Sequence, residues 1–265
     1  MVCKKLNLNR KQIIVPLCDL RSYPTLNSSL ETQLLYGEKI EILDSNNKKW
    51  IYCKSLEDNY PGWIRKTSIG EENNNNYRIS NICSHVYAKP HLKSKIITKL
   101  FYNSKLLITD ANDIWYKIKF KNRNCYIYGK HVSRIKEPNI LNNDWVDIVI
   151  KFLNTVYLWG GKSEAGIDCS GLIQLVLQSC GFQFPRNTKD QYNSKILETI
   201  NENELSKGAL IFWKGHVAIA INKNEIIHAN AHHMKVEIEQ FITAKKRIEN
   251  LYGKVIGIKK LKLGN

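Results

Sequence analysis

One cysteine in the C-terminal half of the chain has the setting of a nucleophile. Cys169 stands in Gly166-Ile-Asp-Cys-Ser-Gly171, where a glycine-bounded turn leads into the apolar run 172–180. A helix that begins there places the sulfur beside unpaired backbone N–H groups and the positive end of the helix dipole. That position lowers a thiol pKa and favours the thiolate. We therefore predict that Cys169 is a nucleophile and that the other six cysteines are small buried apolar residues.

A nucleophile of this kind needs a base, and the base needs a group that orients it. His216 begins one alternating segment, and His228 lies near the end of the next. If residues 222–224 form a three-residue loop, residue 218 pairs with 228, and the two histidines lie diagonally on one face of a hairpin. A two-residue loop would put them on opposite faces. The spacing predicts a relay from Cys169 to His216 to His228, with Ala218 and Ala220 leaving room for the Cys169 helix.

The same three side chains suit zinc, because one thiolate and two imidazoles are ligands of that metal. No fourth protein ligand is identifiable, so the site would have to be open, and we favour the nucleophile. Either histidine alone would be interpreted as a structural residue, and only their joint placement with Cys169 favours catalysis. The other five histidines have no recognisable chemical setting: 85, 91, 131, 232 and 233.

The elements that position these residues predict an α+β domain. Apolar residues from Trp145 to Val156 recur at steps of three and four, which predicts a helix with N-cap candidates at Asn142–Asp144. A second helix follows Cys169, and Gly181 can end it. Thr188 is a cap candidate for a short third helix. Strands then alternate with short turns, as in an antiparallel sheet, over residues 209–213, 216–221, 225–229 and 235–238.

The N-terminal half contains two copies of a small β unit. Pro24 and Pro90 lie 66 residues apart, and Trp50 and Trp115 lie 65 apart, within short alternating segments separated by Gly, Asn and Asp turns. Each copy predicts a small antiparallel barrel. A polar, low-complexity stretch and the segment Lys136–Asn139 interrupt the pattern. The predicted domains are residues 1–70, 78–137 and 138–265, with a linker at 71–77.

Four motifs in the third domain, taken together, are specific. Tyr157-Leu-Trp-Gly-Gly161, Gly166–Gly171, Gly215-His-Val-Ala-Ile219 and Ile227-His-Ala-Asn230 resemble the NlpC/P60 family of cysteine peptidases, which has a papain-like fold. In the first unit, a Gly-Glu turn, a Trp-led strand and Gly-Trp-Ile resemble bacterial SH3 (SH3b) domains. The resemblance implies an α+β, papain-like NlpC/P60 domain preceded by two small all-β SH3b barrels.

The full arrangement resembles γ-D-glutamyl-diamino-acid endopeptidases, which implies a substrate and a set of roles. The substrate would be the γ-D-glutamyl–diaminopimelate amide of peptidoglycan stem peptides with a free N-terminal L-Ala, cleaved in cell-wall recycling. Cys169 would attack the carbonyl, His216 would transfer the proton, and His228 would hold the His216 ring. The Tyr157 hydroxyl and the Cys169 backbone N–H would meet the oxyanion. Substrate contacts would be Asp168, Ser170, Tyr60, Arg186 for the D-Glu carboxylate and Glu31 for the amine, with no metal and no cofactor.

Composition limits the other partner classes. The net charge is +16, and residues 1–140 carry +12 of it (24 basic minus 12 acidic residues). This charge is scattered among many Lys, Asn and Ile residues without a nucleic-acid-binding motif, so no nucleic-acid partner is expected. No apolar segment is long enough to span a membrane, and none follows the basic N-terminus as in a signal peptide. Seven cysteines without a C-x-x-C pair fit a reducing compartment, so we predict a cytoplasmic protein.

One alternative from a different class remains. The SH3b units could bind a wall or a protein partner while the third domain is vestigial. The presence of Cys169, His216, His228 and Tyr157 together argues against it. The oligomeric state does not follow from the sequence.

Overall fold

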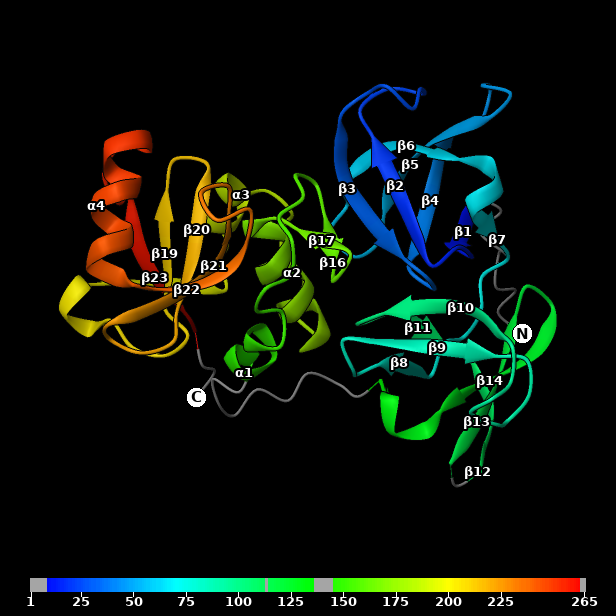
Figure 1. The fold of residues 1–265 in the computed structure, drawn as a ribbon. Helices are drawn as coiled ribbons and strands as arrows, with labels where there is room; N and C mark the ends of the chain where they lie inside the picture. Colours follow the sequence, from blue (N-terminus) through cyan, green and yellow to red (C-terminus); the bar gives the residue numbers. More distant parts are fainter. Residues whose placement is uncertain (1–8, 113, 136–144, 263–265) are drawn as a thin grey trace, which may run out of the picture. The chain divides into compact units, whose positions relative to one another are not determined.

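A computed structural model describes residues 9–112, 114–135 and 145–262 (Figure 1). The chain divides into two compact units, Met1–Ile135 and Lys136–Asn265. The expected break at Lys136–Asn139 and the N-cap candidates Asn142–Asp144 lie outside the described residues. Among the helices that are described, none has the length and apolarity needed to cross a membrane.

The first unit is all-β and contains three antiparallel sheets. Their strand orders are β3-β2-β6-β5-β4-β1-β7, β10-β9-β14-β13-β12 and β11-β8-β15. The strands of the first sheet are β1 (Arg10–Ile13), β2 (Leu17–Arg21), β3 (Leu30–Leu35), β4 (Lys39–Asp44), β5 (Trp50–Ser55), β6 (Pro61–Arg65) and β7 (Ile69–Gly70). The other two sheets contain β8 (Tyr77–Ile79), β9 (Cys83–Tyr87), β10 (Ile96–Phe101), β11 (Lys105–Leu106), β12 (Ile108–Asn112), β13 (Trp115–Phe120), β14 (Arg123–Tyr128) and β15 (Val132–Arg134).

The strand pairings confirm the repeat. In the first half β2 pairs with β3 and β6, and β5 pairs with β4 and β6. In the second half β9 pairs with β10 and β14, and β13 pairs with β12 and β14 in the same way. The closing pairs β1–β7 and β8–β15 also correspond. Two small barrels of the SH3 type are thus built in sequence, each around its own apolar core.

The two barrels join closely near Gly37. The Lys105 N–H donates to the Tyr36 carbonyl at 2.8 Å, and the Tyr36 ring packs into the second core. Gly37 has φ +80°, and a Cβ there would lie 2.1 Å from the Lys105 carbonyl oxygen, so only glycine fits. Residues 71–76 of the predicted linker contain no helix or strand, whereas Tyr77 already begins β8, and the Asn73 N–H donates to the Gln12 side chain at 3.0 Å. Hydrogen bonds therefore join the two barrels to each other and the connecting segment to the first barrel.

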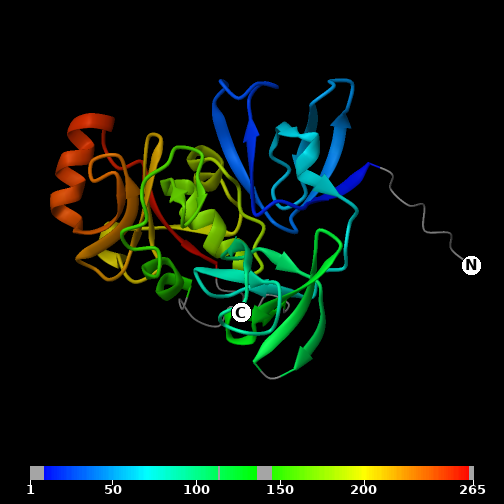
Figure 2. The ribbon, with the colours of Figure 1, turned by 45° about the vertical axis from the view of Figure 1, so that its right-hand side comes forward.

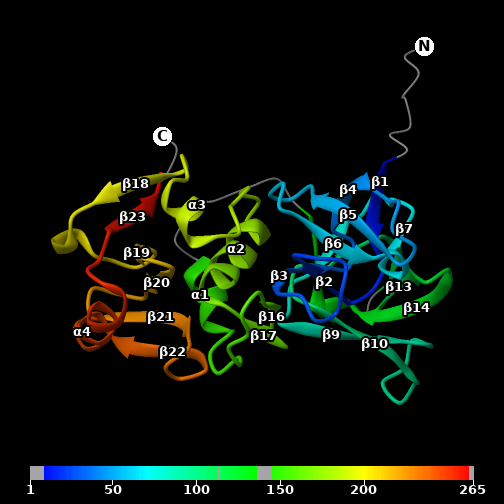
Figure 3. The ribbon, with the colours of Figure 1, turned by 90° about the horizontal axis from the view of Figure 1, so that it is seen from above.

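The second unit is a six-stranded antiparallel sheet with helices on both faces. The strand order is β18-β23-β19-β20-β21-β22, and Figures 1, 2 and 3 show this sheet between α2 and α4. The helices are α1 (Trp145–Ile150), α2 (Cys169–Ser179), α3 (Thr188–Tyr192) and α4 (Phe241–Tyr252). The strands are the short pair β16 (Lys162–Ser163) and β17 (Gly166–Ile167), then β18 (Leu197–Ile200), β19 (Leu210–Trp213), β20 (His216–Ala220), β21 (Glu225–Asn230), β22 (Lys235–Gln240) and β23 (Gly257–Leu261).

The α+β class is confirmed, but several element predictions need correction. The first helix ends at Ile150 instead of continuing to Val156, and Asn154 adopts a left-handed φ of 66°. Helix α4 was not expected after the strands. Ala218 and Ala220 do not make room for α2. They pack with Phe241, Ala244 and Ile248 of α4 in one buried cluster, and α4 therefore covers this face of the hairpin.

Candidate active site

Asp168 caps helix α2 and fixes the turn that presents Cys169. Its Oδ1 accepts from the Gly171 N–H at 2.7 Å, and its Oδ2 accepts from the Gly160 N–H at 2.8 Å. The loop at Gly160–Gly161 can lie against the first turn of α2 because a Cβ on Gly171 would stand 2.4 Å from the Gly161 carbonyl oxygen. The glycines of both motifs therefore permit the close approach that holds Cys169.

Arg186 occupies a different role from the predicted one. Its guanidinium donates to Asp168 Oδ1 at 2.9 Å and Oδ2 at 2.6 Å, and to Ser170 Oγ at 2.8 Å. All three side chains are buried, with Arg186 only 3% exposed. Because Asp168 already binds both terminal nitrogens, Arg186 is not available as the ligand of a substrate carboxylate. It braces the residues on either side of Cys169 instead.

Cys169 is a buried cysteine whose surroundings raise its pKa. Burial, together with the neighbouring Asp168 charge, raises the pKa of Cys169 from 9.0 to about 11. Backbone N–H groups of Val217, on β20, and of Ser170, in α2, hydrogen-bond to the sulfur and lower its pKa, and only the contact from Ser170 follows from the helix position. The desolvation effect is the larger one, so the expected depression of the thiol pKa is wrong, and Cys169 needs a base.

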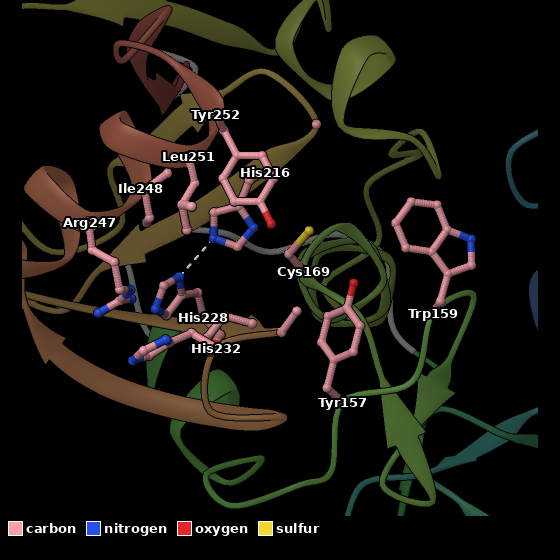
Figure 4. A pocket seen from close by; sticks show the side chains of 13 residues that line it. Tyr157, Trp159, Cys169, His216, His228, His232, Arg247, Ile248, Leu251 and Tyr252 are labelled. Carbon is pink, nitrogen blue, oxygen red and sulfur yellow. Dashed lines mark hydrogen bonds between the residues drawn. The ribbon is translucent and has the colours of Figure 1, made fainter.

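The hairpin has the register that the loop arithmetic required. Ile219 pairs with Ile227 and Ala220 with Ile226, while the Ile221 N–H donates to the Glu225 carbonyl at 2.9 Å. His216 and His228 consequently lie diagonally on one face, and His216 Nε2 is 2.8 Å from His228 Nδ1. Figure 4 shows this bond and places the other nitrogen of His216, Nδ1, on the side of the Cys169 sulfur.

Both rings are held neutral. Burial lowers the pKa of His216 from 6.5 to about 3, with further lowering by His228 and Arg247, while Glu239 opposes the shift. Burial also lowers the pKa of His228, again against an opposing effect of Glu239. These pKa shifts both favour the neutral form of the imidazoles.

A carboxylate and a guanidinium extend the relay beyond the two histidines. Glu239 Oε1 lies 2.7 Å from His228 Nε2, and Arg247 donates to both Glu239 oxygens at 2.5 and 2.6 Å. Sequence reasoning missed both residues because the last strand was ended at Ile238 and α4 was not predicted. The usable signal was the period-two acidic pair Glu237 and Glu239 at the end of that strand.

A cavity of about 440 Å³ opens onto the sulfur. Tyr157 and Trp159 line one side of it, and residues of α4 line another, including Leu251 and Tyr252. The Tyr157 hydroxyl points toward Cys169 in Figure 4. Burial, then the nearby Cys169 and Asp168, raise the Tyr157 pKa, so this hydroxyl stays protonated and can donate. The cavity thus brings together a thiol, two imidazoles and a hydroxyl that can donate a hydrogen bond.

The zinc alternative has no geometric support among the described residues. No three Cys, His, Asp or Glu side chains in them form a metal-binding group. The nitrogens of His216 and His228 that face each other are bonded at 2.8 Å, so the pair does not converge on a common point. His232 lines the cavity, and His233 bonds to Asn230 at 3.1 Å, which gives these two histidines a setting that the sequence lacked.

Comparison with known proteins identifies the family of the second unit. The model of the NlpC/P60 family matches residues 154–253, which include the four motifs and the relay from Cys169 to Glu239. The chain contains an NlpC/P60 domain. The model described as bacterial dipeptidyl-peptidase SH3 domain matches residues 20–69, in the first barrel.

Two relatives align with this chain over most of their own length. A dipeptidyl-peptidase 6 of Lysinibacillus sphaericus is 24% identical over 82% of this chain and 86% of its own. A gamma-D-glutamyl-L-lysine dipeptidyl-peptidase of Bacillus cereus is 26% identical over 83% of this chain and 73% of its own. The crystal structure of an NlpC/P60 family protein from Bacillus cereus shares the fold with a TM-score of 0.80, 22% identity and 95% and 99% coverage of the two chains.

The two substrate contacts predicted outside the NlpC/P60 domain lie together in the first barrel. The Tyr60 hydroxyl donates to Glu31 Oε2 at 3.2 Å. Tyr60 begins the chain segment that leads into β6, and Glu31 lies on β3. Their pairing joins an aromatic ring to a carboxylate, which is a combination suited to an ammonium group.

Proposed function

We propose that this protein is a cysteine endopeptidase that hydrolyses the γ-D-glutamyl–diamino acid amide of peptidoglycan stem peptides. The observation that carries the proposal is the 2.8 Å bond between His216 and His228 beside the buried thiol of Cys169. The names of the relatives support the bond class, since the Bacillus cereus relative is called a gamma-D-glutamyl-L-lysine dipeptidyl-peptidase. The resemblance to muropeptide-trimming enzymes supports a place in cell-wall recycling in the cytoplasm.

The placement of protons defines the first chemical step. Glu239 is ionised because the hydrogen bonds from His228 and Arg247 outweigh desolvation and lower its pKa. His228 Nε2 therefore carries the proton that it shares with Glu239, and its Nδ1 accepts from His216 Nε2–H. This leaves the Nδ1 lone pair of His216 as the base for the Cys169 thiol.

The reaction then proceeds through a thioester. As the sulfur bonds to the γ-carbonyl carbon of D-Glu, its proton passes to His216 Nδ1, and the oxyanion meets the Tyr157 hydroxyl and the Cys169 backbone N–H. His216 returns the proton to the nitrogen of the diamino acid as the C–N bond breaks. Water next attacks the thioester and gives one proton to His216, which restores it to the Cys169 sulfur.

The proposed substrate contacts are those that the family resemblance implies. Asp168 and Ser170 flank the acyl portion, and Arg186 keeps them in place. Tyr60 and Glu31 are the proposed contacts of the free N-terminal amine of L-Ala. Diaminopimelate is the proposed diamino acid. No metal or cofactor takes part in these steps.

The test compares defined peptides with matched variants. The expected result is that L-Ala-γ-D-Glu-diaminopimelate is split into L-Ala-D-Glu and diaminopimelate. Acetylating the L-Ala amine should reduce cleavage sharply, and the C169A variant should be inactive while remaining folded. The peptide with lysine in place of diaminopimelate reports the diamino acid preference. Cleavage by C169A would contradict the cysteine mechanism. Cleavage of the acetylated peptide at the rate of the free-amine peptide would contradict the requirement for a free amine.

A further inference from the structure

Glu239 lies at a strand position from which it bonds directly to His228. In the β21–β22 register His228 pairs with Glu237 and Ile226 pairs with Glu239, so Glu239 is the diagonal neighbour of His228 on the same face. The two carboxylates on this face differ in their partners. Glu239 is 10% exposed and bonds to His228 and Arg247, whereas Glu237 bonds to Lys235 at 2.6 Å.

The carboxylate and the guanidinium form a neutral pair behind the two rings. Arg247 binds both oxygens of Glu239, and the same Oε1 accepts from His228 Nε2. A carboxylate can only accept, so it selects one tautomer of His228 and thereby sets the direction of the proton on His216. When His216 takes the thiol proton, the nearest fixed negative charge along the relay is Glu239.

We propose that Glu239, held by Arg247, is a positioning residue that fixes the His228 tautomer and stabilises the positive charge that forms on His216. The inference rests on the proposed peptidase activity, because it assigns a role within that relay. Arg247 has two effects in this arrangement. It orients the carboxylate, and its own positive charge limits how much basicity Glu239 gives to the rings.

Other ionisable groups also face the relay. His233 Nδ1 lies 3.7 Å from Glu239 Oε1, which is within ion-pair distance but beyond hydrogen-bond length. The remaining groups come from every element packed around the rings: Cys169 at the start of α2, Asp168 as its cap, Tyr157 from the preceding loop, His232 from the turn after β21 and Tyr252 from α4.

The test is charge removal at Glu239 with a matched control on the same strand. E239Q should lower kcat by about 10- to 100-fold, as loss of the carboxylate that orients a metal-bound histidine does, with KM within about 2-fold. E237Q makes the same chemical change at the neighbouring carboxylate and should keep wild-type kinetics. Iodoacetamide alkylation of Cys169 should slow by about 10-fold in E239Q and not in E237Q. Alkylation uses no peptide, so it separates this inference from the identity of the substrate.

A second variant distinguishes an electrostatic role from a structural one. In E239Q the Arg247 charge is left uncompensated beside the rings, so the double variant E239Q/R247Q should be faster than E239Q and slower than wild type. A purely structural role predicts that losing both partners is at least as damaging as losing one. That result would overturn the proposal, as would wild-type kcat and alkylation in E239Q.

A measurement on the unmodified protein keeps the inference testable if E239Q does not fold. In ¹⁵N-histidine spectra, with the resonances of His228 assigned by their loss in H228Q, the wild-type ring should carry its proton on Nε2 and none on Nδ1. A His228 protonated on Nδ1 would reverse the proton order of the relay and end the proposal.

Discussion

Replacing Asp168 by Asn is expected to destabilise the second unit strongly, because it leaves a buried cation without its counter-charge. The side chains of Arg186 and Asp168 are 2% and 9% exposed and meet at 2.6 Å. Breaking such a buried pair by removing one partner costs about 3–5 kcal/mol. Asn is nearly as good an N-cap as Asp, so loss of the α2 cap adds little to this cost.

The control is an exposed pair in the same unit. Asp147 and Lys207 also meet at 2.6 Å, but their side chains are 58% and 39% exposed, so D147N should cost less than about 1 kcal/mol. The free energy of unfolding of both variants is measured by urea titration, with amide hydrogen exchange in peptides from residues 145–262 reporting on this unit alone. The double variant D168N/R186Q should recover part of the loss. If D168N and D147N have equal effects, Asp168 and Arg186 do not form a buried structural pair.

Three further predictions concern the site and the first barrel. Y157F should lower kcat by about 10²–10³-fold and leave Cys169 alkylation unchanged, and a wild-type rate would exclude the hydroxyl as an oxyanion donor. Alkylation of Cys169 in the resting enzyme should rise with pH toward a thiol pKa of about 11, since the thiolate fraction increases steadily as the pH approaches that pKa. A plateau between about pH 5 and 8 would instead show a thiolate–imidazolium pair. Y60A should raise KM for the free-amine peptide but not for its acetylated form, and equal kinetics on both would show that the Tyr60–Glu31 pair does not bind the amine.

The parts of the site that depend on local geometry were predictable from the sequence. The three-residue loop 222–224 fixes the hairpin register, and the period of two then places His216 and His228 on one face. The turn at Gly166–Gly171 places Cys169 at the start of a helix. The barrel repeat was readable because its landmarks recur at constant spacing.

The parts that depend on packing between distant segments were not predictable in the same way. Arg186 reaches Asp168 across 18 residues, and no periodic pattern encodes that contact. The helix dipole gave the wrong direction for the Cys169 pKa, because the outcome depends on burial by the whole domain. Helix α4 is a different case, since Phe241, Ala244 and Ile248 follow a helical spacing that the sequence already contained. Because α4 was not predicted, the role of Arg247, which lies on it, was not predicted either.

The most direct test of the central claim is capture of the acyl-enzyme. The wild-type enzyme would be mixed with L-Ala-γ-D-Glu-diaminopimelate, quenched in acid within the first turnovers and mapped by mass spectrometry. The expected result is the mass of an L-Ala-γ-D-Glu acyl group on the peptide that contains Cys169, absent from C169A, with slower accumulation in H216A. An acyl group on another residue, or product formed by C169A, would contradict the account.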